Sequence, residues 1–375
     1  MRQYIILKQT YLQSNKHIYL NPIMIPVQPV FSLQYFSNKK QIVPHNISSQ
    51  FYLSWEDGLW DIIRSFNIQK DSIILVPSFF CVDVMNNMKA HGLIAQYYEV
   101  DNNLQPNKID LLQKIEKLKP AMIVLFHAVG ITNKLVTKEF INTLSKELFV
   151  IEDCVHRVTN PSEIILCSER HILINSFRKD VPLQGSFVFG NKHIINQLKG
   201  PGTTFFYSWS VIILWFLMQM SYLLQQYIYN SFGKLAEWFM LRGYDIIGDE
   251  QKAGNCPQFF ADLYMHLDFP KIKAIKKEQV AVYKKELRKN EFYYVPQFSS
   301  QDKGELRGFP IVMQKKYGEQ IITSLRENGL FIRAELNDSL WTKDKIIVYL
   351  PLGLHVSLSD IRHITQTINR KLIRV

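Results

Sequence analysis

The stretch that decides the fold is LFVIEDC, residues 148–154, in which an apolar run ends on two carboxylates. A short apolar run of this kind is typical of a strand buried in a sheet. Similar runs occur upstream, at residues 72–77, 94–100 and 121–130. Helical patterns separate them, at residues 82–92, 109–120 and 136–147. The alternation predicts an α/β fold built on a doubly wound, mostly parallel sheet.

The remaining chain extends this unit at both ends. Residues 1–50 have no regular pattern and are interpreted as an N-terminal arm. Residues 51–245 form the predicted large domain, which gains two further strands at 171–177 and 186–190. Residues 246–375 predict a smaller C-terminal α+β domain, with strands at 308–313, 330–335 and 346–351.

Composition excludes several classes of protein. The chain has 375 residues, of which 47% are hydrophobic and 21% charged, so it is globular rather than disordered. Its four cysteines form no CxxC pair, which argues against a disulfide framework and against a zinc site of the usual spacing. We therefore expect no metal. The N-terminus lacks a signal-peptide pattern, so we expect a cytoplasmic protein, either free or at the inner face of the membrane.

Positive charge is unevenly distributed along this basic chain, whose net charge is +11. Residues 1–55 contain five basic residues and no acid, and residues 271–289 contain eight basic residues against two acids. The second cluster is interpreted as a solvated helix face, with attraction to a membrane surface or a phosphorylated ligand as the alternative. No nucleic-acid-binding motif is present, so nucleic acid is not expected as a partner.

A second feature is the absence of charge from residues 200–233. Within them, residues 208–229 predict an uncharged helix that approaches the length needed to span a bilayer. Polar residues such as Gln219 and Gln225 interrupt the apolar run. The helix is therefore predicted to be buried or to lie in a dimer interface, with a membrane-surface helix as the alternative.

In a parallel sheet, ligands bind beyond the carboxyl ends of the strands, where Asp153 and His156 are placed. In this arrangement residues 50–375 resemble the DegT/DnrJ/EryC1/StrS family of pyridoxal-phosphate-dependent sugar aminotransferases. The match is carried by VPSFFC (76–81), LFHAVG (125–130), VIEDCVH (150–156), NSFRKDVPLQGS (175–186) and YLPLGLHVS (349–357). The resemblance implies the type I fold of pyridoxal-phosphate-dependent transferases, a homodimer and the cofactor pyridoxal 5'-phosphate.

The family's functional positions carry over residue by residue. Lys179 matches the lysine that binds the cofactor, and a deprotonated amine is the nucleophile that this role needs. Asp153 matches the carboxylate that keeps the cofactor's pyridine nitrogen protonated. His156 matches a position near the ring hydroxyl, and Ser176 matches a serine that holds the phosphate. The implied reaction moves an amino group from an amino acid, glutamate above all, to a nucleotide-linked keto sugar, for cell-surface polysaccharide or related glycosides.

Three positions depart from the family pattern. The small-residue turn that opens the first helix is replaced by residues 55–58, so that Asp57 stands where backbone amides usually hold the phosphate. The aromatic residue that stacks on the cofactor ring in the family would fall at Phe80 or Cys81, and the better register places Cys81 there. The glycine-rich stretch after the lysine is reduced to residues 184–186. An alternative reading is therefore a catalytically impaired binding or scaffold protein at the membrane surface, against which the retention of both Lys179 and Asp153 argues.

Overall fold

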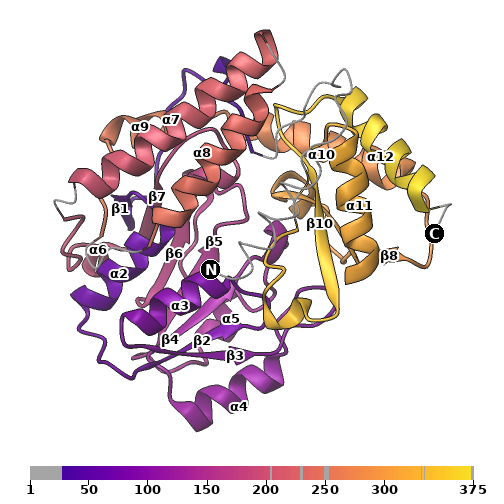
Figure 1. The fold of residues 1–375 in the computed structure, drawn as a ribbon. Coiled ribbons are helices and arrows are strands. Elements are labelled where there is room, and N and C mark those ends of the chain that lie inside the picture. The colour runs from indigo at the N-terminus through magenta and orange to yellow at the C-terminus, as the bar shows by residue number, and fades with distance from the viewer. Residues whose placement is uncertain are drawn as a thin grey trace.

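The computed structural model describes residues 28–202, 205–228, 231–248, 253–330, 332 and 334–372. Most of the predicted N-terminal arm, residues 1–27, lies outside the described residues, as do two residues of the strand predicted at 330–335. Within the described chain, a seven-stranded sheet forms one body and a three-stranded sheet lies beside it (Figure 1). The architecture is the α/β fold with a smaller second sheet that the sequence predicts.

The large sheet has the strand order β1-β7-β6-β5-β4-β2-β3. Its strands are β1 (Ile47–Tyr52), β2 (Ile73–Pro77), β3 (Ile94–Tyr98), β4 (Met122–Phe126), β5 (Phe149–Cys154), β6 (His171–Asn175) and β7 (Ser186–Asn191). Strands β2 to β6 run parallel to one another. At one edge of the sheet, β7 pairs with β6 in antiparallel orientation, and β1 pairs with β7 in the same way. The prediction of a mostly parallel sheet is confirmed, and every predicted strand before residue 191 forms.

The helices predicted at 82–92, 109–120 and 136–147 all form, and a helix before β2 and another after β7 accompany them. They are α2 (Trp55–Ser65), α3 (Val82–Ala90), α4 (Lys108–Leu118), α5 (Lys138–Ile141) and α6 (Lys192–Ile195). Helix α5 is much shorter than the predicted 136–147. The Thr143 hydroxyl donates to the Phe140 carbonyl at 2.7 Å, a local bond that competes with the continuation of the helix.

Strand β1 is a difference from the prediction, because the proposed arm boundary at residue 50 falls inside it. Ile47–Tyr52 pairs with β7 in antiparallel register and forms the outer edge of the large sheet. Phe51 packs its ring against Phe177 and Phe187. The described part of the arm, from Gln28 onward, is thus anchored on the body of the protein.

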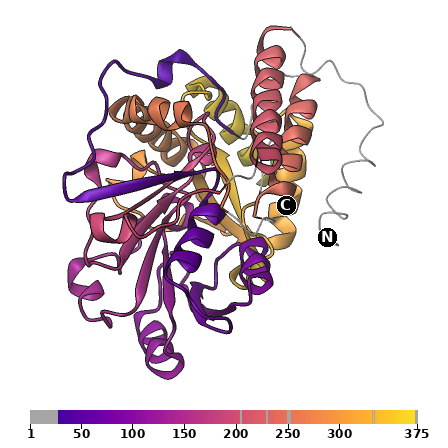
Figure 2. The same ribbon diagram turned by 90° about the vertical axis from the view of Figure 1, so that its left-hand side faces the viewer.

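Two long antiparallel helices, α7 (Phe205–Tyr227) and α8 (Phe232–Ile246), form a hairpin on the flank of the large sheet (Figures 1 and 2). One side of α7 is buried, through residues such as Tyr207 and Val211. Among the described residues, Phe205–Gln225 is the one stretch long and apolar enough to cross a membrane, and 44% of its most apolar window is buried. The predicted uncharged helix therefore exists, and it is only partly covered.

The C-terminal part carries the second sheet, in the order β10-β9-β8. Its elements are α9 (Gln258–Met265), α10 (Phe269–Glu286), β8 (Tyr293–Tyr294), β9 (Gly308–Gln314), α11 (Lys315–Glu327), β10 (Lys345–Pro351) and α12 (Leu358–Leu372). Ala334 bridges to Val348 of β10, where a longer strand is predicted. Helix α9 packs through Phe260 and Tyr264 into the same apolar cluster as β1 and β7. The domain boundary predicted at residue 245 therefore separates elements that share a core.

Candidate active site

The site lies where the order of the parallel strands reverses. Strand β3 lies outside β2, and the chain then returns so that β4 lies on the other side of β2. The segments that follow neighbouring strands diverge at such a point and leave room for a ligand beyond the carboxyl ends. The predicted residues Cys81, Asp153 and His156 all come from loops or strand ends at this edge.

Asp153 is buried in β5, with 2% of its surface exposed. Its Oδ1 accepts the backbone N–H of Val155 at 2.9 Å. Burial raises the pKa of this carboxyl to about 7, against the opposing effects of that hydrogen bond and of the Lys179 charge. Because side chains alternate along a strand, Asp153 faces the site while Glu152 faces the opposite side of the sheet. A cation beside Asp153 would stabilise its ionised form.

Lys179 ends a short 3-10 helix, Phe177–Lys179, that follows β6. Its side chain is half-buried, and Nζ lies 3.5 Å from Nε2 of His156. Its charge also lowers the pKa values of Asp153 and Cys81 relative to what burial alone would give. The fold thus brings together four predicted site residues, Lys179, Asp153, His156 and Cys81, from the end of β5 and from the segments that follow β2, β5 and β6.

His156 is fully buried, and protein groups face both of its ring nitrogens. Arg307 Nη1 lies 2.8 Å from Nε2, and the Tyr349 hydroxyl lies 3.3 Å from Nδ1. Burial and the charges of Lys179 and Arg307 hold the pKa of His156 well below its usual value, so the ring is neutral. Its predicted contact with a cofactor hydroxyl remains a prediction, because these protein partners occupy the ring in this conformation.

A glycine in the motif LFHAVG permits the close packing around His156. Gly130 has a φ of +88°, and a Cβ at this position would lie 2.6 Å from the backbone oxygen of His156. Both the positive φ and this approach exclude larger residues. The loop after β4 is thereby held against the loop after β5.

Three residues of the C-terminal part reach this site without having been predicted. Arg307, just before β9, forms an ion pair with Glu335 at 2.6 Å and stacks over Tyr349. Together with Lys179 these residues line a small pocket, which is completed by Pro29, Gly308, Leu350, Pro351, Leu352 and His355. The sequence signal was weak, since Arg307 is a charged residue before an apolar strand and Tyr349 lies inside one.

Two neighbouring residues, Cys81 and Phe80, are candidates for the position that stacks on a cofactor ring. Phe80 is 3% exposed and packs edge-on against Trp55 and Phe126, within the core. Cys81 begins helix α3 and lies near Lys179, whose charge acts on its thiol. Burial raises the pKa of Cys81 to about 12, so the thiol is protonated. Of the two residues, Cys81 is the one placed at the lysine.

Ser176 and Arg178 both precede the lysine in the chain. Ser176 is 6% exposed, and its side chain makes no capping bond to the short helix that it precedes. The Arg178 guanidinium lies 4.6 Å from the ring centre of Tyr244 on α8, so it turns toward the α7–α8 hairpin. Its Nε is buried and has no hydrogen-bond partner. Lys179 lies beside His156, whereas Arg178, although adjacent in sequence, lies beside Tyr244.

Ser54 caps helix α2, and Asp57 in the first turn is bonded to this cap. The Ser54 hydroxyl accepts the Asp57 backbone N–H at 3.1 Å and donates to Asp57 Oδ2 at 2.6 Å. Asp57 Oδ1 accepts the backbone N–H of Gly254 at 2.7 Å, and the Tyr207 hydroxyl lies 3.4 Å away. The Ser54 cap thus satisfies an N–H of the helix N-terminus from within the chain. The role of Asp57 at a cofactor phosphate remains a prediction, and these bonds to groups of the chain itself do not support it.

The Asp57 carboxyl at the α2 cap predicts a pH dependence of folding. Burial raises the pKa of this carboxyl from 3.8 to about 7. Between those values the folded state holds a proton that the unfolded state has lost, so stability falls as pH rises. We expect wild type to lose up to about 1.4 kcal/mol per pH unit more than Asp57→Asn between pH 5 and 7.

Urea unfolding at pH 5, 6, 7 and 8 measures this difference. Asparagine can keep the bonds to Ser54 and Gly254, and the similar shift of Asp153 is common to both proteins and cancels. Parallel stability curves over this range would show that Asp57 is not the titrating group.

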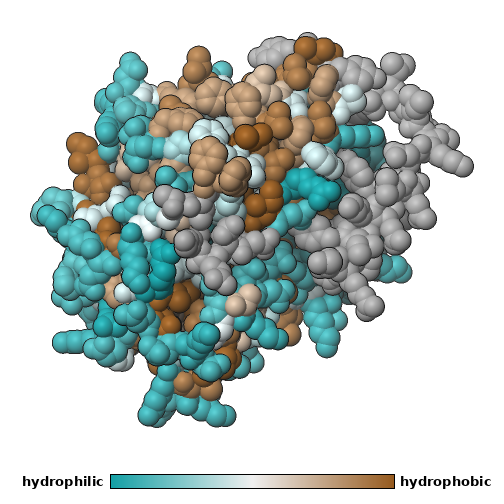
Figure 3. All heavy atoms as spheres, turned by 60° about the vertical axis from the view of Figure 1, so that its left-hand side comes forward, coloured by the Kyte–Doolittle hydropathy of each residue, from teal (hydrophilic) through white to brown (hydrophobic). Residues whose placement is uncertain are grey.

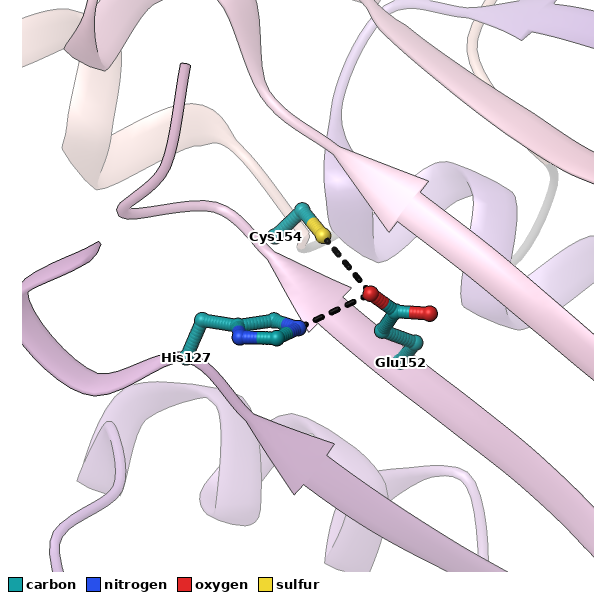
Figure 4. A group of neighbouring side chains, drawn as sticks. All are labelled: His127, Glu152 and Cys154. Atoms are coloured by element: carbon teal, nitrogen blue, oxygen red, sulfur yellow. Dashed lines mark hydrogen bonds and ion pairs between the residues drawn. The ribbon is translucent and has the colours of Figure 1, made fainter. Parts of the chain in front are cut away.

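On the opposite side of β5, Glu152 forms a buried polar cluster (Figure 4). Its two carboxylate oxygens lie 2.8 Å from His127 Nε2 and 2.9 Å from His171 Nε2, and the Cys154 thiol approaches at 3.6 Å. Burial favours the neutral acid, yet the hydrogen bonds from the two histidines hold the pKa of Glu152 well below its usual range. The carboxylate is therefore ionised in the interior.

The three side chains His127, Glu152 and Cys154 have the composition of a metal site, but their protonation opposes one. The Nδ1 atom of His127 accepts the Asn133 N–H at 3.1 Å, and that of His171 accepts the Cys167 N–H at 2.9 Å. Burial lowers the pKa of His127, so this ring is neutral and its proton resides on Nε2, which points at Glu152. Against the effect of burial, the hydrogen bonds to Cys167 and Glu152 raise the pKa of His171 to about 9, so its Nε2 is protonated as well. A metal would need the Nε2 lone pairs, so the cluster is a hydrogen-bonded support for β5.

Comparison with known proteins gives a result at the level of fold. No protein-family model matches the chain, and no curated protein matches it in sequence. Solved structures do match, among them the Helicobacter pylori aminotransferase PseC, involved in the biosynthesis of pseudoaminic acid. That structure has a TM-score of 0.58 and 13% identity, covering 94% of this chain and 100% of the other.

Two further structures agree. The sugar aminotransferase CalS13 from Micromonospora echinospora has a TM-score of 0.56 at 14% identity, covering 92% of this chain and 100% of its own. A DegT DnrJ EryC1 StrS aminotransferase from Brucella abortus has a TM-score of 0.55 at 15% identity, covering 86% and 85%. At these identities the likeness establishes the fold, which is that of the pyridoxal-phosphate-dependent aminotransferases.

Proposed function

We propose that this protein is a pyridoxal-phosphate-dependent aminotransferase that aminates a keto sugar. One observation carries the proposal: the Lys179 amine lies 3.5 Å from buried, neutral His156, at the same sheet edge as buried Asp153. A nucleophilic amine and a buried carboxylate at one site are what an aldehyde cofactor with a pyridine nitrogen requires. Fold alone would not decide function, so the argument rests on these side chains.

The ring end of the cofactor fits the residues present. Asp153 supplies a buried carboxylate whose raised pKa would fall beside a pyridinium nitrogen. Lys179 would bind the aldehyde carbon. Cys81, on the helix that follows β2, offers a small side chain where the ring would lie.

The phosphate end needs a different solution from the helix N-terminus that commonly binds phosphates. Helix α2 is capped by Ser54, and its first turn carries the carboxyl groups of Glu56 and Asp57. We propose that Ser176 and Arg178 hold the phosphate instead. Support comes from the unpartnered, buried Nε of Arg178 and from its charge, which acts on Tyr207 at the α2 cap.

The bound cofactor would act as an electron sink that stabilises negative charge on the substrate carbon. The protein's own groups would supply the proton transfer. Lys179 Nζ would be the base that removes and returns the proton at that carbon, and Asp153 would hold the ring in its protonated form. Neutral His156 faces both Lys179 Nζ and Arg307 Nη1 with Nε2, and would orient the amine and the guanidinium.

The pocket beside Lys179 suits a polar substrate. Arg307 offers a guanidinium to a carboxylate or phosphate, and Glu335 and Tyr349 offer hydrogen-bond partners to sugar hydroxyls. This supports an amino-acid donor such as glutamate and a nucleotide-linked keto sugar as acceptor. We propose in addition a cytoplasmic homodimer that serves polysaccharide or glycoside biosynthesis. The structural likeness to the aminotransferase PseC and the sugar aminotransferase CalS13 is consistent with that substrate class.

The decisive experiment is chemical trapping. Purified protein is mixed with pyridoxal phosphate, its visible absorbance is recorded, and borohydride is added before peptide mapping by mass spectrometry. We expect an absorbance band that borohydride removes, with the reduced label on Lys179. Label spread over exposed lysines, or none with cofactor in excess, would contradict the proposal and favour a binding protein.

A further inference from the structure

The outer side of the α7–α8 hairpin exposes a continuous apolar surface, here called the α7–α8 face. Its exposed members on α7 recur every three or four residues, which places them in one stripe along the helix. The face consists of Phe205 (66% exposed), Phe206 (86%), Trp209 (43%), Ile213 (51%), Phe216 (55%) and, on α8, Trp238 (50%). Figure 3 shows hydrophobic residues gathered over this part of the molecule. So large an apolar patch is typical of an interaction site rather than of a solvated surface.

The inner side of the hairpin is fixed to the body by polar contacts. The Tyr207 hydroxyl lies 3.2 Å from the Gly248 backbone N–H and 3.4 Å from Asp57. Gln219 bonds to Pro29 and Phe31 of the N-terminal segment. Crossing a bilayer would break these bonds and place the polar groups in hydrocarbon, at a cost of several kcal/mol each. The hairpin is therefore built to lie against a surface, not to span a membrane.

Basic residues outnumber acids along the segment that carries the face. Between Asp180 and Glu237 the chain contains no acid, and its Lys192, Lys199 and Lys234 are all exposed. Glu237 itself is 6% exposed and faces inward. On α8 the exposed Asp245 is paired with exposed Arg242 at 3.7 Å, so this acid adds no net charge. The face is thus an uncharged aromatic stripe with lysines before and after it in the sequence, which complements an anionic lipid surface.

We propose that the α7–α8 face docks this protein onto the surface of an anionic lipid bilayer. The stripe lies along a 23-residue helix, about 35 Å long, with tryptophan and phenylalanine rings that suit the boundary between headgroups and acyl chains. Docking of a second copy on this face is disfavoured. In a two-fold dimer the same patch meets itself, so an excess of basic residues would face the same excess, and the exposed acid on α8, Asp245, is already paired with Arg242.

The test uses the full chain and two kinds of vesicle, one of phosphatidylcholine alone and one that also contains roughly 30% of the anionic lipid phosphatidylglycerol. We expect sedimentation with the anionic vesicles, weakened by 0.5 M salt (roughly a 4 Å screening length). The double variant Phe206→Glu/Phe216→Glu should reduce binding by more than about tenfold. The matched control, Ile109→Glu, alters an equally exposed isoleucine on α4 and should bind as wild type does.

Each other outcome overturns the proposal. Equal binding by the double variant and the control would mean that the α7–α8 face is not the docking surface. A protein that ignores both vesicle types, and sediments as a dimer that the double variant dissociates, would assign the face to a second copy. Both altered residues are exposed, so the substitutions should not unfold the protein. A thermal unfolding transition followed by circular dichroism that matches that of wild type will show that the double variant is folded.

Discussion

Lys179→Ala should lower the rate of amino transfer by at least about a thousandfold, because one amine would both bind the cofactor and move the substrate proton. The measurement is the absorbance change when glutamate is added to protein that has been incubated with pyridoxal phosphate. The same variant should lose the borohydride-trapped label. A small primary amine in the buffer should restore part of the rate, since it can replace the missing base.

The control for this prediction is Lys343→Ala, which removes an exposed lysine just before β10. It should react as wild type does. Lys179 is half-buried, and among the described residues its hydrogen-bond partner is His156, so the fold of Lys179→Ala should survive. An unfolding midpoint near that of wild type, together with an undiminished rate, would remove Lys179 from the mechanism.

Glu152→Ala should destabilise the protein by about 3–5 kcal/mol. The substitution leaves the inward-pointing N–H groups of His127 and His171 without an acceptor in a site that excludes water. Glu152→Gln should cost less, because the amide oxygen can still accept one of the two bonds. Urea unfolding at pH 7 measures both values.

Glu147→Ala is the matched control for Glu152. It also removes a carboxylate with a basic partner, Arg170, but its side chain is 82% exposed. Exposed ion pairs contribute roughly 0–1 kcal/mol, so the expected loss is small. If Glu152→Ala and Glu147→Ala cost the same, the buried cluster does not support β5 as argued.

The order and type of the elements follow from local sequence. The apolar runs of β2 to β5 are bounded by polar or proline residues, and each forms a strand within a few residues of the prediction. Periodicity is a property of neighbouring residues, so it can be read without the fold. Lys179, Asp153, His156 and Cys81 are then brought together by topology, because consecutive parallel strands end at one edge.

Other features depend on contacts between distant segments. Helix α5 ends early through a local threonine bond, and β1 becomes a strand only because β7 offers an edge to pair with. Asp57 looks like a residue poised at a phosphate, until Gly254, almost two hundred positions away, donates to it. The burial of a carboxylate depends on what covers it, and no local pattern contains that information.

The sequence by itself determined the α/β fold and the sheet edge where the lysine and aspartate meet, because both follow from hydrophobic periodicity and strand order. Only the tertiary structure decided that Arg307 and Tyr349 enclose His156, and that the uncharged helix α7 is buried on one side and bare on the other. The physical reason is that burial and pairing are set by the partner surface, and that surface comes from residues far away in the chain.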